Sequence, residues 1–259
     1  MIRRIIRALY LNSIGRVERL IKIQHRKKVV KNAFESATER LDIENLNDVL
    51  IIAPHPDDEV FGCGMLIKTL CDAKRKVDVL ILSKGESALP ENVISKQDLI
   101  AKRRALCESA LEKLGLDVTK HLYFGSLPDG NFINSTKADK DELQILISKM
   151  FPKVVFSVHP LEFSKDHVAS ADIVNEAIAN MDIKHYHYLV WLYYKCPIDK
   201  ISSIDFSKAK YHIGNLESKH YSMNIYSNAK TPTGDYLSCK LPRLFLDFCG
   251  QPKELYFEN

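Results

Sequence analysis

Four ionisable side chains within five positions, His55, Asp57, Asp58 and Glu59, are the clearest chemical signal in this chain. An imidazole nitrogen and a carboxylate oxygen are ordinary Zn²⁺ ligands, and a catalytic zinc site needs three protein ligands and one open position. We therefore expect His55 and Asp58 to bind a metal, and Asp57, which lies between them, to accept a proton. The alternative is a helix N-terminus, where such acids cap the helix and suit its dipole.

A short apolar segment comes directly before this cluster and predicts its place in the fold. Residues 49–53 are too short for a helix and rich in β-branched residues, which predicts a strand buried on both faces. The chain then breaks at Pro54 and Pro56, and an apolar-periodic segment that begins at Val60 predicts a helix packed on the strand. Polar groups at the carboxyl end of a buried parallel strand lie where open α/β sheets bind ligands.

The same pattern recurs at residues 153–175. Residues 154–158 predict a second buried strand, and a proline break then leads through polar residues into a helix that carries Asp166 and His167. An Asp-His pair at a helix start also fits a cap and a surface histidine. Its position after a buried strand, as in the first cluster, favours a role in the same site.

The segment from Pro54 to Glu59 resembles the (A/P)HPDDE signature of the PIG-L/LmbE-type zinc-dependent N-acetylglucosamine deacetylases. The resemblance implies that His55 and Asp58 bind zinc, with Fe²⁺ as the other candidate metal, and that Asp57 is the general base. It extends from about residue 48 to residue 257 and does not include the N-terminal arm.

The resemblance also implies that His167 is the third metal ligand. Asp166-His167 matches the second half of the family's H-x-D-H element, and Asp166 would orient an imidazole, a common arrangement around zinc. Glu59 is expected to support the ligands in the same way. The first histidine of that element is Ser164 here, and a serine can donate a hydrogen bond but cannot carry a positive charge. We therefore expect that activity is lower, that the substrate differs, or that another residue such as His159 takes the role of that histidine. Ser164 and His159 are both expected to contact the substrate.

Two weaker matches predict further substrate contacts. Arg103 stands where the family carries an arginine eleven residues before a Leu-Gly pair, and its donor fork can reach a hydroxyl or a phosphate. Alternatively, Arg103 and Arg104 form only the solvated face of a helix. Asp129 lies in a Leu-Pro-Asp-Gly segment that resembles a turn lining the family's substrate pocket, although Pro-Asp-Gly is also a common turn sequence. The glutamate that usually follows the family arginine is Leu106 here.

The remaining pattern predicts elements around these motifs. Strands are expected at residues 77–82, 121–124, 188–194 and 254–257, and helices at residues 97–114 and 219–228. Residues 83–86 resemble the family's T-x-G-E loop, and residues 219–228 resemble a family helix in which Lys219, Tyr226 and Ser227 match.

Length and composition restrict the class of protein. A chain of 259 residues can bury one sizeable core, and its 46% hydrophobic and 27% charged residues are ordinary for a soluble protein. The six cysteines lack a C-x-x-C pair, which indicates reduced thiols. We expect a cytoplasmic location, because no apolar run reaches membrane-spanning length and no signal-peptide core is visible. Without a G-x-G-x-x-G after the first strand, dinucleotide binding has no support.

The first 35 residues are strongly basic. They hold ten Lys and Arg against Glu18 and Glu35, a net charge of +8, so the rest of a chain of net charge +4 carries −4. Apolar residues at helical spacing predict amphipathic helices, divided at Gly15, with a stripe of Ile2, Ile5, Ile6, Leu9, Val17, Leu20 and Ile21. Such an arm can lie on an anionic membrane surface at the cytoplasmic face, or pack its stripe on the domain. Few aromatic residues and an acidic body argue against a nucleic-acid partner.

These observations predict a Rossmann-like three-layer α/β sandwich with a mainly parallel sheet. We expect a basic helical arm at residues 1–46 and a single catalytic domain at residues 47–259. The expected function is metal-dependent removal of the N-acetyl group from an N-acetylglucosamine-type sugar, with release of acetate. The basic arm favours a lipid- or nucleotide-linked sugar of surface glycan biosynthesis. The alternative is a non-catalytic sugar-binding or scaffolding relative, which Ser164 and Leu106 would fit.

Overall fold

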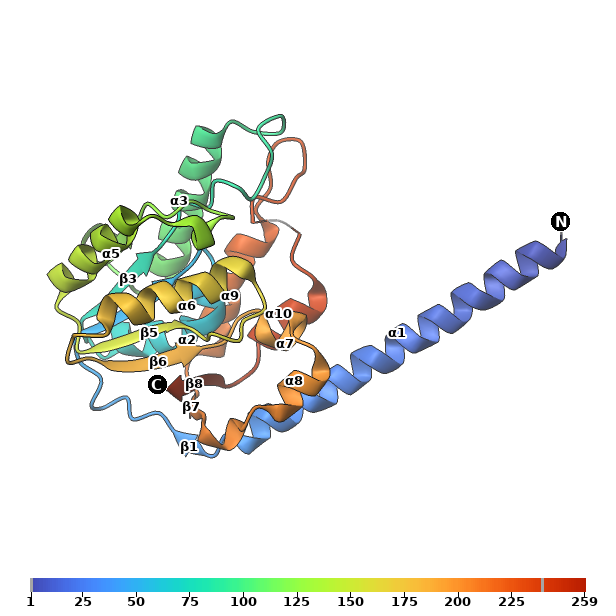
Figure 1. The fold of residues 1–259 in the computed structure, drawn as a ribbon, viewed down its shortest axis with the longest axis horizontal. Helices are drawn as coiled ribbons and strands as arrows, with labels where there is room; N and C mark the ends of the chain where they lie inside the picture. The colour runs from blue at the N-terminus through green and yellow to red at the C-terminus, as the bar shows by residue number, and fades with distance from the viewer. Residues whose placement is uncertain (1, 239) are drawn as a thin grey trace.

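A computed structural model describes residues 2–238 and 240–259, with side chains from Gly15 onward. Within these residues the centre of the fold is one eight-stranded sheet, in the order β1-β7-β8-β6-β5-β2-β3-β4, with helices packed on both faces (Figure 1). The five neighbouring strands from β6 to β4 run parallel, whereas β8 runs antiparallel to β6 and β7. The predicted α/β fold with a mainly parallel sheet is therefore confirmed.

The strands of the sheet and the helices around it have the following bounds. The strands are β1 (Glu39–Arg40), β2 (Val49–Ala53), β3 (Val77–Ile81), β4 (Leu122–Phe124), β5 (Val154–Val158), β6 (Lys184–Tyr188), β7 (Lys210–His212) and β8 (Glu254–Glu258). The helices are α1 (Ile2–Ser36), α2 (Asp58–Asp72), α3 (Lys96–Lys113), α4 (Val118–His121), α5 (Lys137–Met150), α6 (Lys165–Ile178), α7 (Leu192–Lys195), α8 (Ile198–Ser203), α9 (Leu216–Asn228) and α10 (Arg243–Cys249).

The strand β2 is buried on both faces because it pairs with β3 on one side and β5 on the other. Alternate side chains of a strand point to opposite faces. Val49 and Ile51 pack into the core under α2 and α3, whereas Leu50 and Ile52 pack into the core under α5 and α6. This two-sided burial is the physical reason for the continuous apolar run.

The predicted strand at residues 188–194 is wrong. β6 ends at Tyr188, and the short helix α7 begins at Leu192. The backbone N–H groups of Val190 and Trp191 donate to the carboxylate of Glu162, so this apolar segment leaves the sheet and finds its hydrogen bonds elsewhere. The strand β6 itself has the sequence Lys-His-Tyr-His-Tyr. Because of its histidines it is not a continuous apolar run, so the apolar pattern did not predict it.

The N-terminal helix α1 projects from the domain at one end and packs on it at the other (Figure 1). It runs through Gly15 as one helix, so the predicted division there is wrong; a single glycine costs a helix only about 1 kcal/mol. Val30, Ala33 and Phe34 are buried in a core shared with α7 and α8. The strand β1, just beyond α1, pairs with β7. The boundary between residues 46 and 47 stays a prediction.

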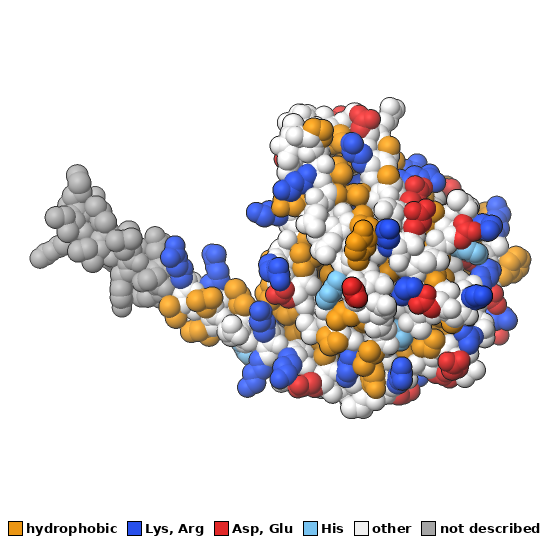
Figure 2. All heavy atoms as spheres, turned by 180° about the vertical axis from the view of Figure 1, so that it is seen from behind, with side chains coloured by type: hydrophobic (Ala, Val, Ile, Leu, Met, Phe, Trp, Pro, Cys, Tyr) orange, Lys and Arg blue, Asp and Glu red, His pale blue; other side chains and the backbone are white. Residues whose placement is uncertain are grey.

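The projecting part of α1 keeps its apolar side chains in the open. Val17, Leu20 and Ile21 are exposed, so the alternative that this stripe packs on the domain is wrong for these three residues. Figure 2 shows that the described part of the projecting helix carries both apolar and basic side chains. The other members of the predicted stripe, Ile2, Ile5, Ile6 and Leu9, lie outside the described side chains.

Two further sequence predictions concern cysteines and membrane spans. The five cysteines that the structure describes are free thiols, as predicted. In the same described part of the chain, no helix has both the length and the apolar character needed to cross a membrane.

Candidate metal centre

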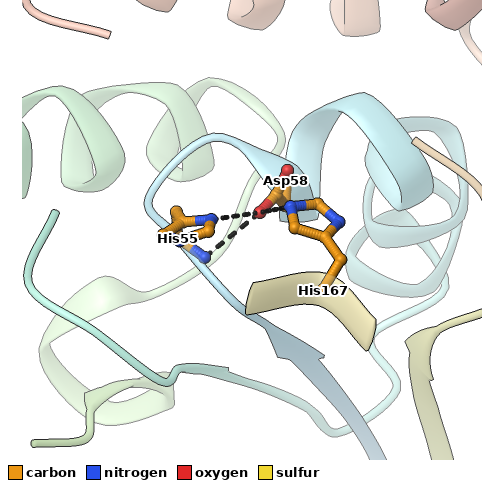
Figure 3. Close-up of side chains that lie close together, drawn as sticks. All are labelled: His55, Asp58 and His167. Carbon is orange, nitrogen blue, oxygen red and sulfur yellow. Dashed lines mark hydrogen bonds and ion pairs between the residues drawn. The ribbon is translucent and has the colours of Figure 1, made fainter. Parts of the chain in front are cut away.

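Two loops at the carboxyl ends of neighbouring strands bring the predicted ligands together (Figure 3). His55 follows β2, Asp58 opens α2, and His167 lies in the first turn of α6 after β5. One oxygen, Asp58 Oδ2, lies 3.2 Å from His55 Nδ1 and 3.1 Å from His167 Nε2. A ligand atom from each residue lies within 4.8 Å of the other two. The three side chains are therefore close enough to share one metal ion.

Asp58 and His167 are buried and hold each other in the charged state. Burial opposes the charge of His167, but the Asp58 carboxylate outweighs it and raises the pKa of His167 to about 9. Burial also opposes the charge of Asp58, but His167 and His55 keep the pKa of that carboxyl well below its usual range. The carboxyl is thus ionised, as a metal ligand must be, and His167 must give up one proton when it binds a metal.

Glu162 orients His167, although no motif in the sequence predicted this role. Its Oε2 lies 3.2 Å from His167 Nδ1, and its carboxylate accepts the backbone N–H groups of Val190 and Trp191 at 2.8 and 2.6 Å. When Nδ1–H donates to this carboxylate, Nε2 is left facing Asp58. Metal-binding histidines usually donate their second nitrogen in this way. The only signal in the sequence was an acid between a buried strand and the helix that carries the Asp-His pair.

Asp166 orients His55 and not the histidine next to it in the sequence. Asp166 Oδ2 and Asp129 Oδ1 each lie 3.2 Å from His55 Nε2. Asp166 also accepts the N–H of Gly130 at 2.7 Å, which fixes the turn that carries Asp129. His55, Asp129 and Asp166 form a second group that could hold a metal. The first group offers two nitrogens and one oxygen, a donor set that is typical of catalytic zinc.

Asp57 stands beside the three candidate ligands at a strained backbone position. Its φ of 141° lies in a region that residues other than glycine rarely adopt, and such strain is common at functional sites. Its side chain makes no capping hydrogen bond to α2, so the helix-cap alternative does not account for it. Burial and the charge of Asp58 raise the pKa of Asp57 to about 8, although Arg103 lies 3.4 Å away and opposes this. Such a carboxyl can take up and release a proton near neutral pH.

Glu59 supports the backbone of Asp57 from inside the core. Its Oε2 accepts the N–H of Asp57 at 2.9 Å, and its Oε1 accepts the hydroxyl of Tyr226 on α9. Burial raises the pKa of Glu59 to about 7. The helix α9 includes the segment that resembles a family helix, and through Tyr226 it supports the loop that carries Asp57.

The adjacent arginines Arg103 and Arg104 occupy different environments. Arg103 is buried, and its Nη2 donates to the carbonyl oxygen of Pro56 at 2.7 Å. Gly85 lies so close that a Cβ there would stand 2.4 Å from Arg103 Nε. Arg104 lies on the helix surface. The solvated-face alternative is therefore wrong for Arg103, whose contact with a substrate stays a prediction.

The side chain of His159 contacts groups other than the three candidate ligands. Its ring packs against those of His187 and Phe257, with centroids 5.6 and 5.1 Å away, and its Nδ1 accepts the N–H of Leu161. Ser164 is the N-cap of α6, but its hydroxyl makes no capping hydrogen bond. Substrate contacts of His159 and of Ser164 both stay predictions.

Helix α2 bends at Cys63, close behind the site. The bend frees the backbone N–H groups of Met65 and Leu66, and Glu254 of β8 accepts both at 2.9 Å. The same carboxylate accepts Lys219 Nζ at 2.7 Å. The final strand therefore holds the helix whose first residues carry the candidate ligands.

Comparison with known proteins identifies sequence relatives for half of the chain. Residues 50–178 match the family model described as PIG-L: GlcNAc-PI de-N-acetylase. Diacetylchitobiose deacetylase of Thermococcus kodakarensis is 30% identical over 156 residues, which are 57% of this chain and 57% of that protein. The match thus spans less than two thirds of the relative's length.

Several solved structures share the fold. N,N'-diacetylchitobiose deacetylase of Pyrococcus horikoshii superposes with a TM-score of 0.57 at 20% identity, over 73% of each chain. The conserved protein TT1542 of Thermus thermophilus gives 0.56 at 17% identity, over 82% of this chain and 94% of that one. The A40926 pseudoaglycone deacetylase Dbv21 gives 0.53 at 20% identity, over 69% and 80%. At these identities, the likeness is one of fold.

Proposed function

Because the chain belongs to the PIG-L family, we propose that it is a metal-dependent hydrolase that removes the N-acetyl group from an acetylated amino sugar. The observation that carries this proposal is the convergence of His55, Asp58 and His167 from two distant loops. Asp57 lies next to them and outside the set of ligands. A binding protein would have no need for this additional buried acid beside a metal site.

The contacts around the two histidines support metal binding. Glu162 faces Nδ1 of His167, and Asp166 faces Nε2 of His55. Each imidazole therefore has one nitrogen engaged by a carboxylate and the other turned toward Asp58. This arrangement suits Zn²⁺, and Fe²⁺ accepts the same ligand types.

The proposed reaction is hydrolysis of the acetamide. A divalent ion at this site would lower the pKa of a water molecule and polarise the acetamide carbonyl. Asp57 takes the proton of the attacking water, and its carboxyl then passes that proton to the leaving nitrogen. The products are acetate and a free amino sugar. The guanidinium of Arg103, 3.4 Å from Asp57, favours the ionised form that accepts the proton.

We further propose that the sugar is lipid- or nucleotide-linked, and that the protein acts in the cytoplasm at a membrane face. The basic arm supports an anionic carrier, because its charge is opposite to that of a phosphate. Arg103, Asp129, Ser164 and His159 are the proposed substrate contacts. Asp129 is held in place by the N–H of Ser87, at 2.6 Å.

Metal content and acetate release test the proposal in wild type and two variants. Asp57→Ala should retain the metal and lose turnover by about 10²- to 10⁴-fold, because it removes only the acid–base group. His167→Ala should lose the metal. His220→Ala, at an exposed histidine on α9, is the matched control and should retain both. Full activity in both site variants would disprove the assignment.

Substrate class is tested by acetate release across GlcNAc-phospholipid, UDP-GlcNAc and diacetylchitobiose. The proposal predicts the highest kcat/KM for one of the first two. The alternative of a non-catalytic sugar-binding protein is motivated by Ser164, which stands where the family element begins with histidine. Tight sugar binding without metal or turnover would favour that alternative.

A further inference from the structure

The projecting part of α1 carries an apolar face that nothing in the domain covers. Val17, Leu20 and Ile21 are 54%, 58% and 62% exposed, and exposed apolar side chains that lie next to one another mark interaction surfaces more often than scattered ones do. Together with Gln24, His25 and Lys28 they line one shallow surface on the helix. We refer to Val17, Leu20 and Ile21 as the apolar face of α1.

The apolar face is not the side of α1 that packs on the domain. Arg26 Nη1 donates to the carbonyl oxygens of Tyr193 and Cys196 at 2.9 and 2.8 Å, and Val30 and Ala33 are buried farther along. Because successive helical residues turn by about 100°, these packed residues lie roughly opposite to the apolar face. The face is therefore presented to the surroundings while the other side of the helix holds it to the domain.

Charge indicates what covers this face. Two exposed basic residues, Lys28 and Lys31, lie on the side of α1 that carries this face, and the exposed Arg16 and Lys27 lie at its edges. Figure 2 shows both basic and apolar side chains along the described part of the projecting helix. A second copy of α1 would bring two strongly basic helices together, and their repulsion opposes that pairing. An anionic surface attracts the same charges.

We propose that α1 docks the protein on an anionic lipid membrane and lies in the plane of the surface. Val17, Leu20 and Ile21 insert among the headgroups, while the flanking Lys and Arg side chains contact lipid phosphates. The domain, fixed to the opposite side of the helix, is then held at the membrane. This docking does not depend on the proposed deacetylase activity, because binding to lipid requires no turnover.

Co-sedimentation of the full chain with vesicles tests the proposal. We expect binding to vesicles of phosphatidylcholine and phosphatidylglycerol, little binding to phosphatidylcholine alone, and loss of binding as salt is raised. Lys28→Gln and Lys31→Gln should each weaken binding about fivefold, because each Lys or Arg near such a surface contributes about that factor. Leu20→Ser with Ile21→Ser should abolish it.

Ile145→Ser is the matched control for the apolar face. Ile145 is 54% exposed on α5, the same exposed fraction as Val17, and its replacement should leave vesicle binding unchanged. Circular dichroism should show that each variant keeps its helix content. Equal binding to both kinds of vesicle, or binding that survives Leu20→Ser with Ile21→Ser, would overturn the proposal. So would a concentration-dependent dimer that the same double substitution dissolves, because a second copy would then be the occupant.

Discussion

Glu254 offers the sharpest test of how the fold supports the site. Its carboxylate accepts four donors, namely the N–H groups of Met65 and Leu66, the ammonium of Lys219 and the hydroxyl of Tyr256, at 2.7 to 2.9 Å. Lys219 and Glu254 are both buried. Replacement of Glu254 therefore affects a helix bend and a buried charge at the same time.

The expected loss in the free energy of unfolding depends on which of the two charges is left without a partner. Glu254→Gln leaves the Lys219 ammonium buried without a counter-charge, and removal of one partner of a buried pair costs about 3–5 kcal/mol. Lys219→Met leaves a carboxylate that still accepts three hydrogen bonds, so we expect a smaller loss of about 1–3 kcal/mol. The double variant should be more stable than the sum of the two predicts, with a coupling of about 1–3 kcal/mol.

Urea unfolding followed by circular dichroism measures these free energies. Glu108→Gln breaks an exposed i,i+4 pair with Arg104 and is the control, with an expected loss under about 0.5 kcal/mol. Because α2 begins at Asp58, Glu254→Gln should also weaken metal binding in the folded fraction. Additive losses below about 1 kcal/mol for both single variants would refute the reasoning, since buried partners must couple.

Three further predictions follow from other contacts. Glu162→Gln should weaken metal binding about 10- to 100-fold, measured by competition with a chelator, because His167 loses the carboxylate that orients it. Gly62→Ala should destabilise the fold by about 1–3 kcal/mol in urea unfolding, because a Cβ would stand 2.2 Å from the Tyr188 ring. The free energy of unfolding should decrease as the pH falls below 6.5, because of His185. Burial, with the charge of His187, lowers the pKa of His185 to about 3, so the unfolded chain binds a proton that the native state does not bind. The stability this histidine contributes is complete above pH 6.5 and declines by about 1.4 kcal/mol per pH unit toward pH 3, as urea midpoints at pH 7 and pH 5 would show.

Each of these predictions has a control within the chain. Glu217→Gln on the exposed surface of α9 should leave metal binding unchanged, and Gly15→Ala, where no atom lies within 4 Å of the added Cβ, should not destabilise the fold. Substitution of His185 by Gln should flatten the decline between pH 7 and pH 5. An unchanged metal affinity in Glu162→Gln, a neutral Gly62→Ala or an unchanged pH slope would each contradict the corresponding argument.

The sequence by itself predicted the sheet strands β2 and β5 and the polar loops that follow them. Both strands are continuous apolar runs because both faces of each strand are covered, and such burial is visible in the order of residues. Parallel neighbours end at the same edge of a sheet, so the proximity of His55 and His167 followed from the expected fold. For residues 188–194 the same pattern predicted a strand that does not exist, because an apolar segment outside the sheet can be buried as well.

Only the tertiary structure decided which side chain contacts which. Asp166 is adjacent to His167 in the sequence but contacts His55, whereas Glu162 contacts His167 across the turn before α6. The exposed position of Leu20 likewise depends on which side of α1 meets the domain. Sequence periodicity records whether a residue is buried, a local property of its strand or helix. The partner of a polar group is set by how separate loops and helices cross, which depends on the packing of the whole chain.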